Sequence, residues 1–210
     1  FLMPHMTEMK QTDIRTEFGA FKNSQVWFTV IMGVVGFGGM FSVYTYISWT
    51  MTEVAGMDQS LIWVVLMAYG IGMTIGNAFG GWLADRNLEF GIIFALACLI
   101  VILTAFYFLS GHAIPATLCF GCVAFMGSTL VPSLQLRLVH VAGDAQTLAA
   151  ALNQSALNIA NAAGATIGGA VVGAGLGYSA PALAGAALAA AGCLVWAATM
   201  WDKKRLSRRA

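Results

Sequence analysis

The sequence has little charge, and this shortage excludes a water-soluble domain. Only 9% of its 210 residues are Asp, Glu, Lys or Arg, whereas soluble domains average about 25%. Hydrophobic residues make up 59% of the chain, and the mean hydropathy is +0.79. A chain of this composition needs a lipid bilayer as the solvent for its apolar side chains. The net charge of +1 gives no indication of nucleic-acid binding, and we expect no nucleic-acid partner.

Lysine and arginine are absent from alternate loops between the apolar stretches. Six stretches are each near the roughly 20 residues that cross a bilayer, namely 25–52, 60–83, 90–110, 113–136, 147–176 and 179–201. All 10 Lys and Arg residues fall on one side of these stretches, and the opposite loops carry Glu53, Asp58 and His112. This positive-inside pattern predicts an all-α polytopic membrane protein with six transmembrane helices and both ends in the cytoplasm.

Groups that carry chemistry are also scarce. No charged residue lies in the middle of a stretch, and such residues are the usual marks of a proton relay in a membrane. No Ser/His/Asp or metal-ligand set shares a site, so we expect no enzyme activity, no cofactor and no metal. Cys119 and Cys122 form a C-x-x-C without a second pair, and we interpret them as small apolar side chains.

The charge pattern also suggests the domain organisation. We expect a cytoplasmic linker over 1–24, a six-helix transmembrane bundle over 25–201 and a basic cytoplasmic tail over 202–210. The chain begins with Phe1 rather than Met, and its first five residues resemble the last turn of an earlier membrane helix. We therefore expect the chain to be one part of a longer polypeptide.

The fifth stretch is the most polar of the six. Gln154, Asn158 and Asn161 follow i, i+4, i+7 spacing and share one helix face. Amides facing lipid are costly, so this face meets protein or a water-filled cavity. Two interpretations follow: a substrate-binding face, or interhelical hydrogen bonds that hold the bundle together.

Small and aromatic residues form two further patterns. Small-xxx-small spacing, which lets helices approach closely, occurs at Gly72, Gly76 and Gly80 and again at Gly164, Gly168, Gly169, Gly173 and Gly177. Aromatic residues gather near the outer end of the first stretch, at Phe41, Tyr44, Tyr46 and Trp49. These aromatics form either an interfacial belt or the wall of a ligand cavity.

The most specific motif is Gly80-Gly81-Trp82-Leu83-Ala84-Asp85-Arg86, between the second and third stretches. Glycine lets the helix end approach its neighbour, Asp85 can accept backbone N–H bonds at a helix N-terminus, and Arg86 anchors the turn at the lipid head groups. From Gly81 onward, this motif resembles the loop motif of the major facilitator superfamily.

Other matching segments resemble the C-terminal half of the drug:proton antiporter branch, which includes arabinose-efflux permeases and chloramphenicol exporters. They are Gly36-Phe37-Gly38-Gly39, Tyr44-Thr45-Tyr46-Ile47, Gly76-Asn77, Ala151 to Asn161 and Gly168-Gly169. Two segments depart from the family pattern. Asn87-Leu88-Glu89-Phe90 replaces basic residues, and Ser48-Trp49-Thr50 replaces a segment with proline. The first departure predicts a weaker cytoplasmic latch, and the second a helix that is stiffer or bends at its glycines.

The resemblance implies a twelve-helix transporter of the bacterial inner membrane, of which this chain is the C-terminal half and residues 1–24 the inter-half linker. It would export a small organic solute, a drug or a sugar, by alternating access. The expected substrate contacts are Tyr44, Ser48, Asn77, Gln154 and Asn158, and the expected conformational motif is Gly81, Asp85 and Arg86. Proton coupling would fall to acids in the N-terminal half. The alternative is a six-helix, non-transporting subunit that scaffolds a larger membrane complex with a second subunit.

Overall fold

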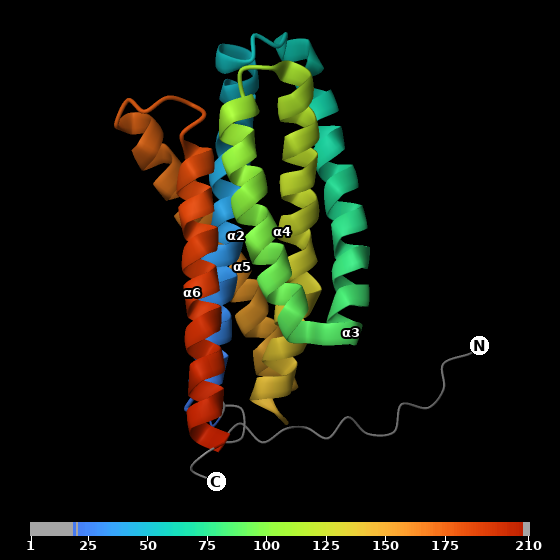
Figure 1. Ribbon diagram of the computed structural model, residues 1–210, viewed down its shortest axis with the longest axis vertical. Helices are drawn as coiled ribbons and strands as arrows, with labels where there is room; N and C mark the ends of the chain where they lie inside the picture. The colour runs from blue at the N-terminus through green and yellow to red at the C-terminus, as the bar shows by residue number, and fades with distance from the viewer. Residues whose placement is uncertain (1–18, 20, 208–210) are drawn as a thin grey trace, which may run out of the picture.

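The computed structural model describes Gly19 and residues 21–207, and every regular element in that part of the chain is helical. The long helices are α2 (Ser24–Trp49), α3 (Ile62–Leu109), α4 (Ala113–Ala142), α5 (Gln146–Gly173) and α6 (Pro181–Ser207). Each is long and apolar enough to cross a membrane, and together they form one upright bundle (Figure 1). The all-α membrane architecture predicted from the sequence is confirmed. Residues 1–18 and 20 of the predicted linker lie outside the described residues.

The second and third predicted spans are the two arms of a single helix, α3, so six predicted spans correspond to five long helices. The arms meet at Asn87, whose φ of −156° and ψ of 94° are not helical. Figure 1 shows the first arm descending to this turn and the second arm ascending from it, so the two arms are antiparallel. Asn87 also caps the second arm, because its Oδ1 accepts a hydrogen bond from the Phe90 amide at 3.1 Å.

α6 continues as a helix through Ser207, beyond the predicted end of the bundle at residue 201. Lys204 and Arg205 lie in its last turn. Positive side chains there stabilise the helix, since the carbonyl end carries partial negative charge. The segment 202–207 is therefore a helical extension of α6.

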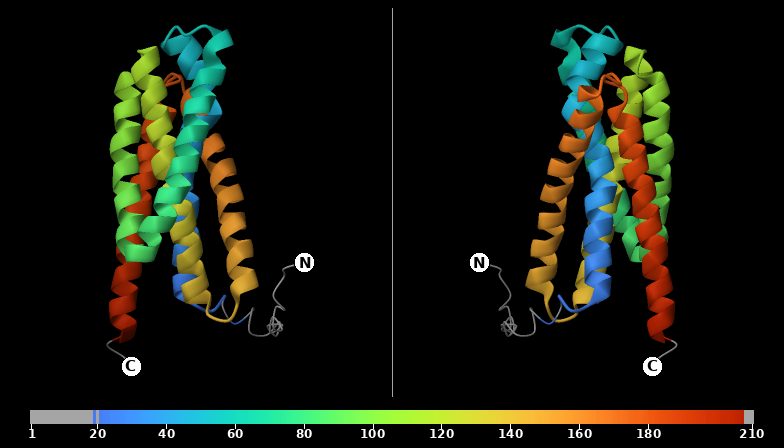
Figure 2. Two further views of the ribbon diagram at one scale, coloured as in Figure 1. Left: turned by 90° about the vertical axis from the view of Figure 1, so that its right-hand side faces the viewer. Right: turned by 90° about the vertical axis from the view of Figure 1, so that its left-hand side faces the viewer.

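α2 is the central helix of the bundle and packs against α4, α5 and α6. In its most apolar stretch 67% of the residues are buried, whereas the corresponding figure for α5 is 22%. α5 therefore presents most of its surface outward. Figure 2 shows α5 leaning away from the first arm of α3 toward the end of the bundle where the chain terminates.

Close helix packing is confirmed at Gly72, Gly76 and Gly80 and at Gly164, Gly168 and Gly169, but not at Gly173 and Gly177, which have nothing within 4 Å. A Cβ added at Gly76 would overlap the Phe125 backbone of α4, and the neighbouring stripe positions meet α4 in the same way. On α5, a Cβ added at Gly168 would lie 2.9 Å from the Ser42 carbonyl oxygen of α2. Two pairs of helices therefore touch through backbone atoms, as small-xxx-small spacing allows.

A short π-helix, η1 (Thr50–Val54), continues α2 directly after Ser48-Trp49. Such a widened turn is a feature often found at functional sites. Beyond it, Asp58 begins the 3-10 helix η2 (Gln59–Leu61), and its Oδ1 accepts the Ser60 amide hydrogen bond at 2.8 Å. Hydrogen bonds from Ser60 lower the pKa of the Asp58 carboxyl.

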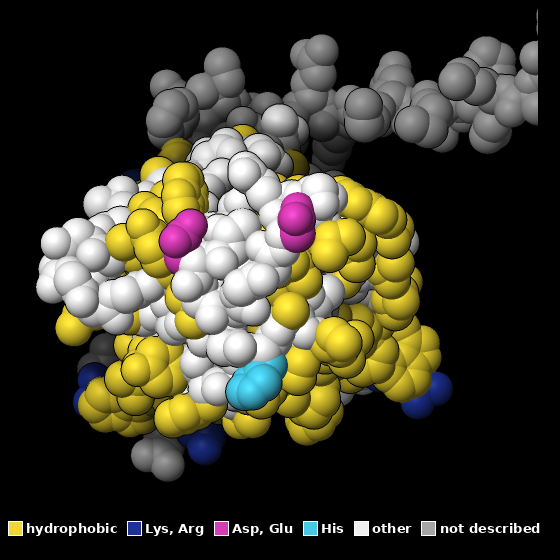
Figure 3. All heavy atoms as spheres, turned by 90° about the horizontal axis from the view of Figure 1, so that it is seen from above, with side chains coloured by type: hydrophobic (Ala, Val, Ile, Leu, Met, Phe, Trp, Pro, Cys, Tyr) yellow, Lys and Arg dark blue, Asp and Glu magenta, His cyan; other side chains and the backbone are white. Residues whose placement is uncertain are grey.

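Basic side chains gather at one end of the bundle, and the outer loops carry Glu53 and Asp58 but no Lys or Arg. We call the end that carries η1, η2 and the turn before α4 the outer end, and the opposite end the inner end. Figure 3 shows the outer end from above, with acidic side chains and a histidine on the face and Lys or Arg only at its margins. The tertiary structure therefore preserves the charge separation found in the sequence.

Candidate functional site

Tyr44 belongs to an aromatic cluster that joins α2 to the first arm of α3 and to α4. Its ring centroid lies 4.8 Å from that of Tyr69 and 6.5 Å from that of Phe120, and the Tyr69 and Phe120 rings stack at 4.7 Å. Tyr44 is nevertheless 41% exposed, whereas Tyr69 and Phe120 are buried. The cluster therefore presents one aromatic surface, Tyr44, outward from the bundle.

Tyr46, two residues further on, has a different role. Its hydroxyl donates a hydrogen bond to the Ala165 carbonyl of α5 at 3.0 Å. Its ring packs against Gly168 and Gly169. Two aromatic residues that are neighbours in the sequence thus have different roles. Tyr46 holds α5 to α2, whereas Tyr44 faces outward.

Ser48 lines a cavity of about 340 Å³ at the outer end of the bundle. The other lining residues come from η1 and the segment after it, with Trp49 from α2: Trp49, Thr52, Glu53, Met57 and Gln59. The cavity has hydroxyl, amide, carboxylate and apolar walls. Ser48 therefore lies in an outer vestibule rather than beside the other predicted contacts.

The amide face of α5, which we define as Gln154, Asn158 and Asn161, is exposed. Small residues such as Ala156 and Gly164 form the opposite, buried side of the helix. Within the described part of the chain, none of the three amide side chains makes a hydrogen bond to another helix. The interpretation of this face as interhelical glue therefore has no support inside this bundle.

The register between α2 and α5 follows from their glycine contacts. Gly164 packs on the Gly38 carbonyl and Gly168 packs on the Ser42 carbonyl. The two contacts lie four residues apart on both helices, and the residue numbers rise in the same direction. The two helices are therefore parallel. The depth of any α5 side chain can therefore be given as a position along α2.

The five predicted contacts lie at different depths. Asn158 is level with Met32, and Tyr44 lies twelve residues, or about 18 Å, farther out. Ser48 and Gln154 are about 30 Å apart along the bundle axis, which is about the thickness of the hydrocarbon core. One small solute cannot touch both at once.

Asn77 lies close to the middle of the bundle. Its neighbour Gly76 on α3 packs on Phe125 of α4. Two residues further along α4, Gly127 packs on Met40 of α2. Asn77 is therefore level with Met40, about one turn inward of the aromatic cluster. Its side chain is exposed and donates a hydrogen bond to the Met73 carbonyl at 3.1 Å. Of the α5 amides, Asn161 comes nearest to this depth, and sequence reasoning did not select it as a contact.

The loop motif is arranged differently from the expectation. Gly80 packs tightly on Thr129 of α4, whereas a Cβ added at Gly81 would meet open space. Arg86 lies over the Trp82 ring at 4.2 Å from its centroid, a cation–π contact. Asp85 is exposed, and its side chain makes no hydrogen bond in the described part of the chain. Of the two glycines in the motif, Gly80 makes the close approach to a neighbouring helix, because Gly80 faces α4.

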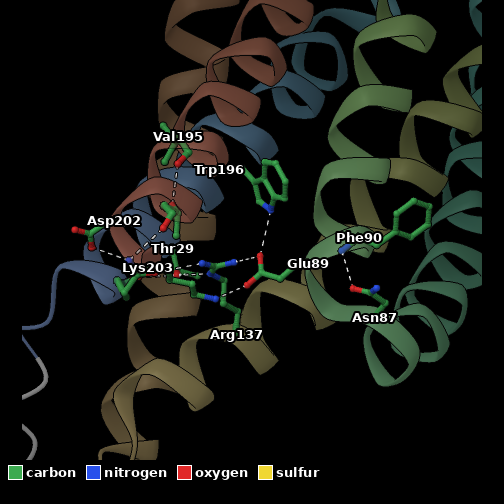
Figure 4. Close-up of polar contacts among 11 residues, drawn as sticks. Thr29, Asn87, Glu89, Phe90, Arg137, Val195, Trp196, Asp202 and Lys203 are labelled. Carbon is green, nitrogen blue, oxygen red and sulfur yellow. Dashed lines mark hydrogen bonds and ion pairs between the residues drawn. The ribbon is translucent and has the colours of Figure 1, made fainter. Parts of the chain in front are cut away.

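Glu89 forms the main charge cluster of the bundle, and sequence reasoning missed it. Its Oε2 accepts hydrogen bonds from Arg137 Nη1 and from Trp196 Nε1, the latter at 3.2 Å. Its Oε1 accepts one from Lys203 Nζ at 2.6 Å. Figure 4 shows these side chains converging from α3, α4 and α6. The only signal in the sequence was an acid where basic residues were expected.

A second layer of hydrogen bonds joins α2 to this cluster. Arg137 Nε donates to Thr29 Oγ1 at 3.1 Å, and its Nη2 donates to Gln25 Oε1 at 3.4 Å. The Gln25 amide in turn donates to Asp202 Oδ2 at 2.7 Å. We call Glu89, Arg137, Lys203, Trp196, Thr29, Gln25 and Asp202 the inner cluster. It connects four helices at the inner end of the bundle.

The fold defines a multi-pass α-helical membrane protein, and comparison with known sequences extends this result. No family model matches the chain. The chain is 34% identical over 179 residues to the inner membrane transport protein YdhP of Escherichia coli K12, covering 85% of this chain and 46% of the relative. It is 35% identical over 185 residues to the uncharacterized MFS-type transporter YfhI of Bacillus subtilis, covering 87% and 46%.

A third relative is the chloramphenicol resistance protein of Streptomyces lividans, which is 28% identical over 186 residues, with 87% of this chain and 46% of the relative covered. The chain belongs to the major facilitator superfamily. It spans about half the length of the curated relatives it matches.

Proposed function

We propose that this chain is the C-terminal half of a secondary transporter that exports a small organic solute by alternating access. The amide face of α5 carries the proposal. Gln154, Asn158 and Asn161 are exposed without hydrogen bonds to the rest of the described bundle, and amides facing lipid are costly. A water-filled cavity between two halves satisfies them, and transporters of this architecture bind substrate near the midplane between repeats.

The candidate contacts fall into three groups by depth: those near the middle of the bundle, one near the inner end and one near the outer end. Of the five candidate contacts, Tyr44, Asn77 and Asn158 lie nearest the middle of the bundle. They are spread over about 18 Å of depth, and we place the solute-binding region between Tyr44 and Asn158. Gln154 lies toward the inner end and Ser48 lines the outer cavity, so they contact the solute on entry and release. The order of these polar groups supports a path across the membrane.

The chemistry of the solute-binding region favours a solute without net charge. The candidate contacts offer one aromatic ring, amide groups and a hydroxyl, whereas charged side chains of the described chain lie toward the two ends of the bundle. A drug-like or sugar-like molecule fits this surface. We assign proton coupling to acids in the N-terminal half, and we propose that the protein lies in the bacterial inner membrane with both ends in the cytoplasm.

Export by the full-length protein tests the proposal. Cells lacking their major exporters would express it, and accumulation of labelled chloramphenicol and arabinose would be measured with and without a proton uncoupler. Lower accumulation of either solute, reversed by the uncoupler, supports an exporter. Unchanged accumulation of both, together with a polypeptide mass near 22.1 kDa and co-purifying membrane subunits, would instead favour the scaffold alternative.

A further inference from the structure

We propose that Glu89 is the carboxylate that positions the inner end of this half during the transport cycle, in place of Asp85. The inference rests on the proposed function, because it assigns a step in transport. Both carboxylate oxygens of Glu89 accept hydrogen bonds, from Lys203 on one side and from Arg137 and Trp196 on the other. Asp85 is exposed and has no hydrogen-bond partner among the described residues.

The burial of Arg137 makes the charge of Glu89 necessary. The Arg137 side chain is 1% exposed, and that of Glu89 is 29% exposed. A buried guanidinium that loses its anion is strongly destabilised, because it keeps the desolvation cost without the compensating charge. Thr29 and Gln25 accept its remaining hydrogen bonds but carry no charge. Glu89 is therefore the group that keeps Arg137 in place.

The position of Glu89 in the chain explains how it acts on the whole half. It follows the Asn87 turn by two residues, so its contacts attach the junction of the two α3 arms to α4 and α6 (Figure 4). Gln25 and Thr29 extend the attachment to α2. The described members of the inner cluster come from four helices and not from α5. The cluster therefore makes the helices behind the amide face move together, as rocking of one half requires.

The test measures transport by the full-length protein in proteoliposomes, using whichever of chloramphenicol or arabinose it exports. Glu89→Gln removes the charge and keeps the size, and Glu89→Asp keeps the charge. We expect Glu89→Gln to lower the maximal rate about tenfold with KM changed less than about twofold. Glu89→Asp should recover most of that loss, and Asp85→Asn should cost much less than Glu89→Gln. Asp58→Asn, the same acid-to-amide change at the outer end, is the control and should leave transport unchanged.

The outcomes separate this inference from the proposed function. A wild-type protein that transports neither solute overturns the proposed function and this inference with it. An active wild type with Glu89→Gln at the wild-type rate, or with Asp85→Asn more impaired than Glu89→Gln, overturns the inference alone. If Glu89→Gln does not fold, Lys203→Gln replaces it, because the Lys203 side chain is 42% exposed and its loss leaves Arg137 paired. A reduced rate with unchanged KM supports the inference, and an unchanged rate contradicts it.

Discussion

Depth along a helix decides what an exposed polar side chain can do in a membrane. Gln154 and Asn158 share one face of α5, yet they differ by one helical turn, about 6 Å, along the axis. Asn158 comes within reach of the middle of the bundle, whereas Gln154 stays near the inner end. Two identical amide groups thus have different expected roles.

Asn158→Ala should therefore impair transport more than Gln154→Ala. We expect Asn158→Ala to raise KM about tenfold through loss of a hydrogen bond to the solute, and Gln154→Ala to have a smaller effect. Uptake into inverted vesicles over a range of solute concentrations measures both. Ser155→Ala is the matched control, since the Ser155 hydroxyl is exposed and bonds to the Ala151 carbonyl of its own helix. Equal loss of folding yield and transport in Asn158→Ala would contradict a binding role.

At the scale of elements, backbone contact at glycines brings neighbouring helices close together, in addition to the buried hydrophobic core. α5 meets α2 at its glycines, and the first arm of α3 meets α4 at its own. In lipid, such contacts matter because the hydrophobic effect adds little between helices that are already in an apolar solvent. Glycine residues therefore contribute much of the contact between these helices.

Gly168→Leu should prevent α5 from docking on α2. A Cβ at Gly168 would lie 2.9 Å from both the Ser42 carbonyl oxygen and the Tyr46 ring, so a leucine forces the helices apart. We expect a large loss of folded protein, measured as monodisperse yield in size-exclusion chromatography. Gly173→Leu makes the same change on the same helix, at a position with nothing within 4 Å, and should fold normally. Normal yield for Gly168→Leu would contradict the α2–α5 interface.

The α3 turn gives a second prediction at this scale. Asn87→Ala removes the oxygen that accepts the Phe90 amide hydrogen bond, which should lower stability by about 1 kcal/mol. Asn87→Asp keeps the acceptor and should stay close to the wild type. Thermal unfolding in detergent, followed by tryptophan fluorescence, compares the two. An Asn87→Ala protein as stable as the wild type would show that the cap contributes nothing.

At the scale of the whole molecule, charge and hydrogen bonding divide the bundle into two different ends. The inner end is fastened by the inner cluster across α2, α3, α4 and α6, whereas the outer end has a π-helix and a polar cavity. Under the proposed function, a bundle fastened at one end and open at the other suits rocking against a partner half. The charge asymmetry also predicts the orientation in the membrane.

Labelling of single cysteines tests that orientation. In a full-length protein with its native cysteines replaced, a cysteine at Asp58 or His112 should react with a membrane-impermeant maleimide in intact cells. A cysteine at Arg86 or Lys204 should react only after permeabilisation. The opposite pattern would contradict the predicted cytoplasmic position of both ends.

Membrane class, span positions and charge separation could be predicted from the sequence alone. These properties depend on local composition, since about 20 apolar residues cross a bilayer whatever their neighbours are. The glycine stripes were also predictable, because one helix face follows from residue spacing. The exposure of the α5 amide face was only one of two predicted alternatives.

Only the tertiary structure decided the register between helices and the partners of charged groups. Ser48 and Gln154 separate in depth because Gly164 packs on Gly38, a contact between residues far apart in the chain. Glu89 and Arg137 meet because two helices bring them together at the inner end. Spacing along one helix specifies its faces, but the positions of those faces against other helices depend on packing across the whole bundle.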